Sequence, residues 1–570
     1  MDTIPAVLEA RLRAALERMG PVGTIGPVVT LATDSRFGDY QTNIAMLLAK
    51  QQRANPRDIA GRIIGNLDVA GICEQPEIAG AGFINFRVTA AHLQQRLAAI
   101  AADSMLGVPP VADPQTIVID FSSPNVAKPM HVGNIRSTIL GDTLARVARF
   151  LGHRVITDNH IGDWGTQFGM VIYGWKHWRD QSALESSPVE ELVRLYKKAN
   201  ALNETDPDVR RECREELVKL QQGNAENVEI WRQCVALSWR EFEKAYSQLD
   251  IRFDEHLGES AYNDRLAPLV QRLLDQGIAE ISEGAVCIFF RDIPALADKP
   301  CLIRKGDGGF LYGTTDLATI EYRIERWHPD QIWYVVGVTQ QLHFDQVFAA
   351  ARRMGIHAGL RFIPFGSILG ENRKLMKTRS GENVSLASLL AEAEERALAL
   401  VEQKNPELSG PEKLEVARAV GIGAVKYADL SQARMTDYIF SWERMLSFQG
   451  NTAPYLQNAY VRVRSIFRKL DGPWAPPAPL ALEEPAELAL AKKLVQLAET
   501  VPQVLDDFRP NILANYLFEL ANTFHAFYEA CPVLKAAEPA RGTRLALCDL
   551  TGRILHKGLE LMGIRAPERM

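Results

Sequence analysis

Residues 116–142 read TIVIDFSSPNVAKPMHVGNIRSTILGD, and this stretch decides the expected fold. It opens with a continuous apolar, β-branched run, Thr116–Phe121, which is typical of a buried parallel strand. A polar loop containing proline follows, and apolar residues then recur every three or four positions over 132–151, which predicts a helix ended by Gly152. Val155–Ile156 begins the next strand. Strand, loop, helix and strand in this order predict the βαβ unit of a doubly wound, Rossmann-like parallel sheet.

Three regions are expected around this unit, because 570 residues exceed one ordinary domain. Residues 1–108 mix helical periodicity with an alternating strand pattern, which predicts a small α+β domain that ends at a Pro-rich linker. Residues 115–390 form the predicted α/β region, with strand-like runs at 285–290, 310–312 and 331–336 and a helical insertion at about 175–280. Residues 391–570 have helical period almost throughout, which predicts an all-α bundle.

The composition is that of a globular chain, with 47% hydrophobic and 24% charged residues. No run reaches the roughly 18 apolar residues that a membrane span needs, and the N-terminus resembles neither a signal nor a transit peptide. We therefore expect a cytoplasmic protein without a membrane partner. The seven cysteines include no CxxC pair, so neither a disulfide framework nor a zinc site is expected. A net charge of -6 excludes a uniformly basic surface but leaves room for local basic patches.

Two short segments carry the chemistry. His131 and Gly133 come at the predicted start of a helix, where unpaired N–H groups attract anions and a glycine lets a flat base approach the backbone. Residues 372–381, NRKLMKTRSG, bring Lys374 and Lys377 into a Gly-flanked loop suited to stabilising phosphate charge. An ordinary capped helix with a surface histidine, and a solvated basic loop, remain the alternatives for each segment alone. Together the two segments predict a nucleotide site that lacks a Walker lysine.

The pair resembles the HIGH and KMSKS signatures of class I aminoacyl-tRNA synthetases, as HVGN at 131–134 and KLMKT at 374–378. Longer segments resemble the arginyl-tRNA synthetases in particular and extend over nearly the whole chain. They are FGDYQTNIAM (37–46), IDFSSPNVAKPMHVGNIRSTILGD (119–142), NHIGDWGTQFG (159–169), YGTTDLATIEYR (312–323), VKYADLS (425–431), GNTAPYLQNAYVRVRSIFRK (450–469) and the terminal APERM. One position departs from the family, which usually has histidine where this chain has Asn134. An asparagine keeps a neutral N–H donor but cannot carry charge.

The resemblance implies an arginine–tRNA ligase, which joins arginine and ATP into arginyl-adenylate and then transfers arginine to the terminal ribose of its tRNA. The substrate carboxylate is the nucleophile, so the protein supplies alignment and charge stabilisation. The phosphates would be held by Lys128, His131, Asn134, Lys374 and Lys377, with Gly133 beside the nucleotide and Mg²⁺ travelling with the ATP. The family also implies that activation requires bound tRNA, and that the protein is usually a monomer.

The arginine ligands implied by the resemblance are Asp120, Ser123, Asn125, Tyr312, Asp316 and Gln340. We expect Asp120, Asp316 and the Tyr312 hydroxyl to meet the guanidinium, because a planar fork calls for carboxylates. Ser123, Asn125 and Gln340 would then take the amino and carboxylate groups. Each acid alone could equally be a surface charge or a helix cap.

Contacts with tRNA are expected at both ends of the chain. In the N-terminal region Phe37 and Tyr40 could stack on a splayed base, with Asp39 or Asn43 reading its edge; a turn packed by aromatic residues is the alternative. In the tail Tyr460, Arg464 and Arg468 share one predicted helix and form a basic face, which the resemblance makes part of an anticodon-binding bundle; a solvated helix edge is the alternative.

Rival functions remain at this point. The chain could be a small-molecule nucleotidyltransferase with the same phosphate site, which never binds RNA. It could be an RNA-binding paralogue whose active site has decayed, with Asn134 as the sign, or a synthetase for another amino acid. Two carboxylates with a tyrosine favour a cationic substrate.

Overall fold

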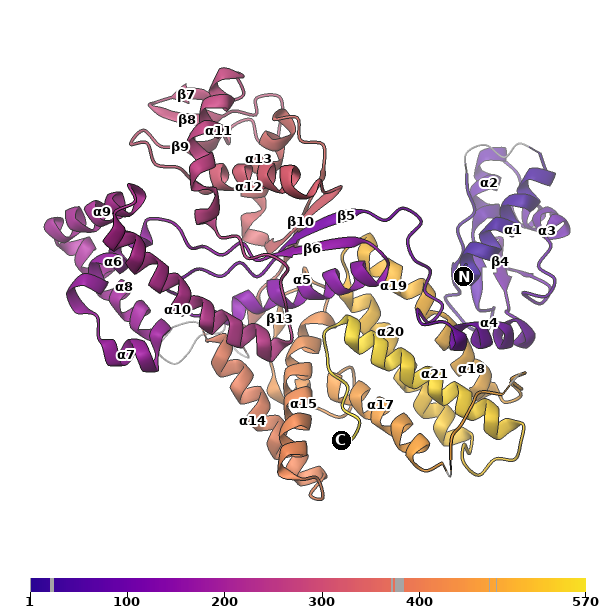
Figure 1. Ribbon diagram of the computed structural model, residues 1–570. Helices are drawn as coiled ribbons and strands as arrows, with labels where there is room; N and C mark the ends of the chain where they lie inside the picture. Colours follow the sequence, from indigo (N-terminus) through magenta and orange to yellow (C-terminus); the bar gives the residue numbers. More distant parts are fainter. Residues whose placement is uncertain (1, 21–24, 371–372, 375–383, 471, 478) are drawn as a thin grey trace.

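The computed structural model describes residues 2–20, 25–370, 373–374, 384–470, 472–477 and 479–570. The N-terminal region, indigo in Figure 1, is a sheet in the order β1-β2-β4-β3 with antiparallel pairing, packed against helices. Its elements are α1 (Ile4–Arg18), β1 (Thr30–Leu31), β2 (Tyr40–Thr42), α2 (Ile44–Gln52), α3 (Pro56–Asn66), β3 (Glu77–Ala79), β4 (Phe83–Phe86) and α4 (Ala90–Ala102). The predicted α+β character of this region is confirmed.

The middle region contains the predicted parallel sheet, in the order β11-β10-β5-β6. The chain builds β6 on one side of β5 and returns to build β10 on the other, so the strand order reverses next to β5. Ligands bind at the carboxyl ends of strands at such a reversal. The elements are β5 (Thr116–Asp120), α5 (Val132–Phe150), β6 (Arg154–Asp158), α12 (Tyr312–Trp327), β10 (Gln331–Gly337), η2 (Val338–Gln340), α13 (Gln341–Arg353) and β11 (Gly359–Phe365).

Helix α5 packs directly on the sheet because Gly141 carries no side chain. A Cβ at this position would lie 2.2 Å from Cγ of Phe121, which follows β5. Every residue from Ile135 to Leu144 is buried, so nearly the whole helix lies in the interior. The close approach holds the middle of α5 against the residue that follows β5.

Two insertions interrupt the middle region (Figure 1). The first is helical, as predicted, and comprises α6 (Gln167–Trp178), α7 (Gln181–Ser186), α8 (Pro188–Thr205), α9 (Pro207–Gln221), α10 (Ala225–Leu249), η1 (Glu259–Tyr262) and α11 (Asn263–Asp275). The second is a separate antiparallel sheet of β7 (Glu280–Ser282), β8 (Ala285–Ile288) and β9 (Cys301–Arg304). The predicted strand at 310–312 is wrong, because Tyr312 begins α12 instead.

The C-terminal region is the predicted helical bundle, and it lies against the sheet region through α5, α15 and α19 (Figure 1). It begins with α14, within which the predicted boundary at 390–391 falls. Its helices are α14 (Leu386–Lys404), α15 (Gly410–Leu430), α16 (Trp442–Met445), α17 (Ala453–Arg468), α18 (Pro485–Val495), α19 (Leu497–Asp506), α20 (Pro510–Ala530) and α21 (Ala540–Leu561), and short strand β13 (Tyr438–Ile439) pairs with β12 (Ile368–Leu369). In the part of the chain that is described, no helix has both the length and the apolar character needed to cross a membrane.

Candidate active site

The start of α5 is held by a reciprocal cap. Nδ1 of His131 accepts a hydrogen bond from the Gly133 N–H at 3.0 Å, and the His131 N–H donates to Oδ1 of Asn134 at 3.0 Å. Asn134 thus caps the helix with its oxygen and keeps its amide N–H₂ as a donor. The asparagine that departs from the family pattern therefore has a defined task in this chain.

His131 is a neutral donor in this arrangement. Because its Nδ1 accepts from Gly133, the proton of the neutral ring lies on Nε2. Burial, and then the nearby charge of Lys128, lower the pKa of His131 below its ordinary value. A neutral imidazole offers a phosphate a hydrogen bond without a full positive charge.

A cavity of about 200 Å³ opens beside this helix start. His131 and Gly133 line one side, and Val338 and the segment Phe365–Ile368 line others. Gly133 is required by the cap itself, since a Cβ there would lie 2.7 Å from Cε1 of the His131 ring. The cavity lies at the carboxyl ends of β10 and β11, next to the N-terminus of α5, where a nucleotide is expected.

The loop between β5 and α5 has a constrained backbone. Ser122, Ser123 and Ala127 all adopt positive φ angles, of 73°, 43° and 59°. A buried polar network supports the loop. Ser122 Oγ lies 2.8 Å from Tyr246 Oη, and Asn159 Nδ2 donates to Tyr246 Oη at 3.0 Å. Non-glycine residues with positive φ persist only where the surroundings hold them, and they concentrate at functional sites.

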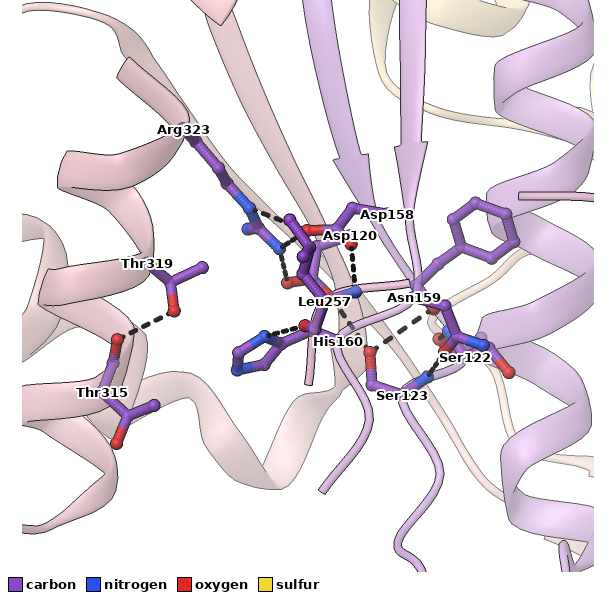
Figure 2. Close-up of polar contacts among 12 residues, drawn as sticks. Asp120, Ser122, Ser123, Asp158, Asn159, His160, Leu257, Thr315, Thr319 and Arg323 are labelled. Carbon is purple, nitrogen blue, oxygen red and sulfur yellow. Dashed lines mark hydrogen bonds and ion pairs between the residues drawn. The ribbon is translucent and has the colours of Figure 1, made fainter. Parts of the chain in front are cut away.

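The Asp120 carboxylate is buried and hydrogen-bonded within the protein. Its Oδ2 accepts from Nη2 of Arg323 at 2.6 Å, and its Oδ1 accepts from Oγ of Ser123 at 3.0 Å. Figure 2 shows that Arg323 also reaches Asp158, at 2.8 Å. Asp120 is 5% exposed. In this structure the guanidinium that Asp120 meets is the chain's own, and a contact between Asp120 and substrate arginine stays a prediction.

Asp316 lies in a group of acids that the sequence pattern only partly predicted. As expected, Tyr312 and Asp316 are one turn apart on α12. Oδ2 of Asp316 lies 2.5 Å from Nε2 of His343 on α13. Burial, followed by the charges of Asp316 and Asp163, raises the pKa of Glu259 to about 8. The sequence patterns did not point to Glu259 or His343, and the one local signal for Glu259 is the GES turn between α10 and α11 within the helical insertion.

Tyr312 completes this group. Its ring is 65% exposed, and its pKa is raised by burial and then by the charge of Glu259. The charge of Asp316 acts on Glu259, and the charge of Glu259 acts on Tyr312, so these three side chains lie around one region, which we call the acid pocket. A carboxyl whose pKa is raised by burial and by a neighbouring acid is suited to binding a cation, because a positive charge favours its ionised form.

The other expected substrate ligands lie around the same edge of the sheet. Ser123 is partly buried beside Asp120, while Asn125 is exposed and packs its Oδ1 over Gly162. Gln340 ends η2 directly after β10 and is exposed. Lys128 is exposed, but its Nζ lies 5.9 Å from the Tyr196 ring of the helical insertion.

The second motif is only partly described. Lys374 is exposed, and its carbonyl oxygen accepts from the Gly370 N–H at 2.8 Å. Lys377 lies outside the described residues. The motif follows β12, whose strand continues from the wall of the cavity.

The expected RNA contacts of the N-terminal region divide into two kinds. Phe37 is 50% exposed and Asn43 is also exposed, as a base contact requires. Tyr40 is 2% exposed, and its hydroxyl donates to Oε1 of Glu499 in α19 at 2.7 Å. The expectation that Tyr40 stacks on a base needs correction, because its ring is buried at the junction of two regions.

The expected basic face of α17 contacts the chain's own C-terminal segment, although Arg464 and Arg468 stay exposed. Oε1 of Glu568 accepts from the Tyr460 hydroxyl at 2.7 Å, and Oε2 accepts from Nε of Arg464 at 2.8 Å. Nη1 of Arg468 donates to the Glu568 carbonyl at 2.8 Å. Tyr460 is also 6% exposed. Because these side chains are hydrogen-bonded to the C-terminal segment, an RNA that contacts α17 here would also contact that segment.

The geometry brings two complementary sites, one for phosphate and one for a cation, to one edge of the sheet. The start of α5, with the Nε2–H of His131 and the amide of Asn134, suits phosphate oxygens. The acid pocket on α12 and η1 suits a cation. Adenylation of a cationic carboxylic acid would need these two sites side by side.

Comparison with known proteins gives one consistent result along the chain. Residues 6–88 match the family model described as the arginyl tRNA synthetase N-terminal domain, residues 96–442 that of the class I (R) tRNA synthetase catalytic domain, and residues 456–570 that of the DALR anticodon binding domain. Arginine–tRNA ligases of Thermobifida fusca and Cellvibrio japonicus are 46% and 44% identical, each over 99% of both chains.

Solved structures agree. The arginyl-tRNA synthetase of Plasmodium falciparum superposes with a TM-score of 0.85 at 28% identity over 100% of both chains. That of Thermus thermophilus superposes with a TM-score of 0.83 at 26% identity, over 99% of this chain and 100% of the other.

Proposed function

The chain belongs to the arginyl-tRNA synthetase family, and on that premise we propose how its residues activate arginine and transfer it to tRNA. It is an arginine–tRNA ligase: the arginine carboxylate attacks the α-phosphorus of ATP, pyrophosphate leaves, and the terminal ribose of tRNA then takes the arginyl group. Because the substrate provides the nucleophile, the protein's task is to align the reactants and stabilise charge.

The acid pocket is the observation that carries the choice of arginine. Asp316 is held by His343, and the pKa of Glu259 is raised to about 8, first by burial and then by the charges of Asp316 and Asp163. A guanidinium between them would donate to two carboxylates in its own plane, with the Tyr312 hydroxyl beside it. The ammonium of lysine is a point charge and would leave part of this fork unpaired.

The opposite end of the substrate is assigned to the edge of the sheet. Ser123, Asn125 and Gln340 follow β5 and β10 and would hold the α-amino and carboxylate groups. Asp120 would support this end by accepting a hydrogen bond from the Ser123 hydroxyl, while Arg323 pairs with both Asp120 and Asp158. The carboxylate nucleophile would then lie toward the start of α5.

The ATP phosphates are assigned to the start of α5. Nε2 of His131 and the amide of Asn134 donate there without adding charge, and the helix N-terminus contributes its unpaired N–H groups. Lys128, Lys374 and Lys377 would add the positive charge that pyrophosphate departure requires, as their positions in the two motifs imply. Mg²⁺ would enter on the phosphate oxygens as part of the substrate.

Binding of tRNA is assigned to the two outer regions. Phe37 and Asn43 are exposed on the N-terminal sheet region and could hold an unstacked base of the tRNA elbow. The match of residues 456–570 to an anticodon binding domain supports an anticodon site in the helical region. Affinity for tRNA should fall as salt rises, because phosphate contacts release counterions. A salt-independent dissociation constant would count against these contacts.

The remaining assignments follow the family. We propose a cytoplasmic monomer with three parts, residues 1–108, 115–390 and 391–570, which would bind the tRNA elbow, the substrates and the anticodon. The rival functions are not favoured by full-length identity to arginine–tRNA ligases. Light scattering on a sizing column would test the monomer, since a dimer would elute at twice the mass.

Replacement of Asp316 tests the guanidinium assignment. Asp316→Asn keeps the shape but removes one charge of the acid pocket, so the KM for arginine should rise at least about 10-fold while that for ATP changes little. Glu325→Gln is the matched control, since Glu325 is on the same helix but pairs with Arg265 at the surface. Equal changes in both KM values for Asp316→Asn would remove the assignment.

A second experiment tests the order of events. ATP–pyrophosphate exchange measures adenylate formation directly. We expect exchange with arginine only when tRNA is present, and exchange in its absence would contradict tRNA-dependent activation.

A further inference from the structure

Arg136 is a buried arginine in the second turn of α5, and neither motif includes it. Its side chain is 1% exposed, and Nε donates to Oδ1 of Asp429 on α15 at 3.2 Å. Its Nη1 donates to the carbonyl of Thr436 at 3.2 Å. The guanidinium carbon lies 5.3 Å from the Tyr438 ring centre and 5.9 Å from that of Phe365. One planar group therefore contacts three segments at once, namely α15, the stretch with Thr436 and Tyr438, and the end of β11.

Those segments meet behind the wall of the nucleotide cavity. The Phe365–Ile368 wall is backed by residues 434–440, which we call the backing segment. The carbonyl of Pro364 accepts from Arg434 at 2.6 Å, and the Gly366 N–H donates to the Arg434 carbonyl at 2.9 Å. Strand β12 then pairs with β13. The wall and the backing segment thus form one hydrogen-bonded body.

Arg136 is the link between that body and the start of α5. It also lines the cavity, together with His131 and Gly133 one turn earlier on the same helix. Its Nη2 is buried and has no hydrogen-bond partner among the residues that the structure describes. A buried donor without a partner costs stability, so the placement of this guanidinium calls for an explanation other than stability.

We propose that Arg136 is a positioning residue for ATP, which sets the distance between the helix start that holds the phosphates and the wall that covers the nucleotide. The guanidinium contacts the backing segment through the Thr436 carbonyl and the Tyr438 ring. It contacts the cavity wall through the Phe365 ring and α15 through Asp429. Arginine is suited to this task because its rigid fork holds two acceptors in one plane while both faces pack on rings. The inference deepens the proposed function and rests on it.

A single substitution would mix two effects. Arg136→Met removes the link but also leaves Asp429 buried without its ion pair, and breaking a buried pair is strongly destabilising. The double variant Arg136→Met/Asp429→Asn removes both charges, so stability should largely recover while the link stays broken. Arg136→Lys keeps the charge and loses the fork.

The test compares steady-state constants with melting temperature for these three variants. Rates are measured by aminoacylation well below each Tm. The double variant is expected to recover most of the Tm lost in Arg136→Met, yet to show kcat/KM for ATP lowered 10- to 100-fold, the range for a reactant displaced by about 1 Å. The KM for arginine should stay within about twofold of wild type. Arg136→Lys should shift the KM for ATP in the same direction by less.

A second buried pair supplies the control. Arg544 and Glu487 join α21 and α18 at 2.7 Å, with side chains 11% and 1% exposed, away from the cavity. Arg544→Met/Glu487→Gln should alter Tm without changing either KM. The inference is overturned if kcat/KM for ATP recovers with Tm in the Arg136 double variant. It is also overturned if the KM values for ATP and arginine change equally. If the wild type does not charge tRNA with arginine, the proposed function fails instead.

Discussion

Arginine binding should release a proton from Glu259, and this gives the acid pocket a measurable signature. The pKa of the Glu259 carboxyl is raised from 4.5 to about 8, first by burial and then by Asp316 and Asp163. At pH 7 the protonated form then outnumbers the ionised form by roughly ten to one. A guanidinium ion binds the ionised form, so the proton must leave when arginine enters.

The pH dependence of arginine binding follows from the difference between the pH and the pKa of Glu259. Each pH unit below about 8 adds about 1.4 kcal/mol to the cost of ionising Glu259, so the dissociation constant for arginine should rise about tenfold per unit. Above about pH 8 the constant should level off. Glu259→Gln should bind arginine weakly and with little dependence on pH, because its amide does not titrate in this range.

Titration calorimetry in buffers of different ionisation enthalpy measures both quantities. The wild type should release close to one proton at pH 7, and Glu259→Gln should release about none. Glu255→Gln is the control, because Glu255 pairs with Arg326 outside the acid pocket. A wild-type dissociation constant that is flat between about pH 6 and 8, with no proton released, would refute the reasoning.

Arginine binding should strengthen as pH rises, whereas the contribution of Glu259 to the stability of the free protein should fall. The folded state binds the Glu259 proton more tightly than the unfolded state, so this contribution is complete below about pH 4.5 and is lost as pH rises through about 8. Glu259→Gln should therefore melt higher than the wild type at about pH 9. The acid pocket would then cost stability in order to bind a cation.

Three other predictions concern separate parts of the chain. His343→Ala should raise the KM for arginine about tenfold and leave that for ATP almost unchanged, since Asp316 loses the donor that orients it; an effect confined to ATP would contradict this. Burial raises the pKa of Glu499 to about 7, so the wild-type Tm should fall more between pH 5 and 8 than that of Glu499→Gln, and equal slopes by calorimetry would exclude the contribution. Gly141→Ala should lower the free energy of unfolding by about 1–3 kcal/mol or more in denaturant titrations, because its Cβ would overlap Phe121; unchanged stability would contradict the close packing.

The elements that sequence predicted best are those with purely local signals. The apolar run of β5 and the helical period of α5 each follow from neighbouring residues, and both elements begin where their patterns begin. The three-residue run 310–312 was too short to distinguish a strand from a helix start, and Tyr312 begins α12. Local patterns lose their meaning at that length.

The site was less predictable because its partners are distant in sequence. Asp120 has the residue type expected of a substrate ligand, but its charge is met by Arg323, 203 positions away. Tyr40 likewise meets Glu499, 459 positions away. The raised pKa of Glu259 depends on its burial next to Asp316, and the spacing of residues in the sequence does not predict that burial. Residue type predicted which chemistry was present, and the fold decided which groups remained free for it.

Charging of total tRNA with each amino acid in turn is the most direct test of a site built from a carboxylate fork and a phosphate-binding helix start. The account predicts acceptance of arginine in the presence of ATP, with lysine discriminated against by about 10⁴-fold in kcat/KM. Equal charging with lysine, or no charging with arginine by the folded wild-type chain, would contradict it.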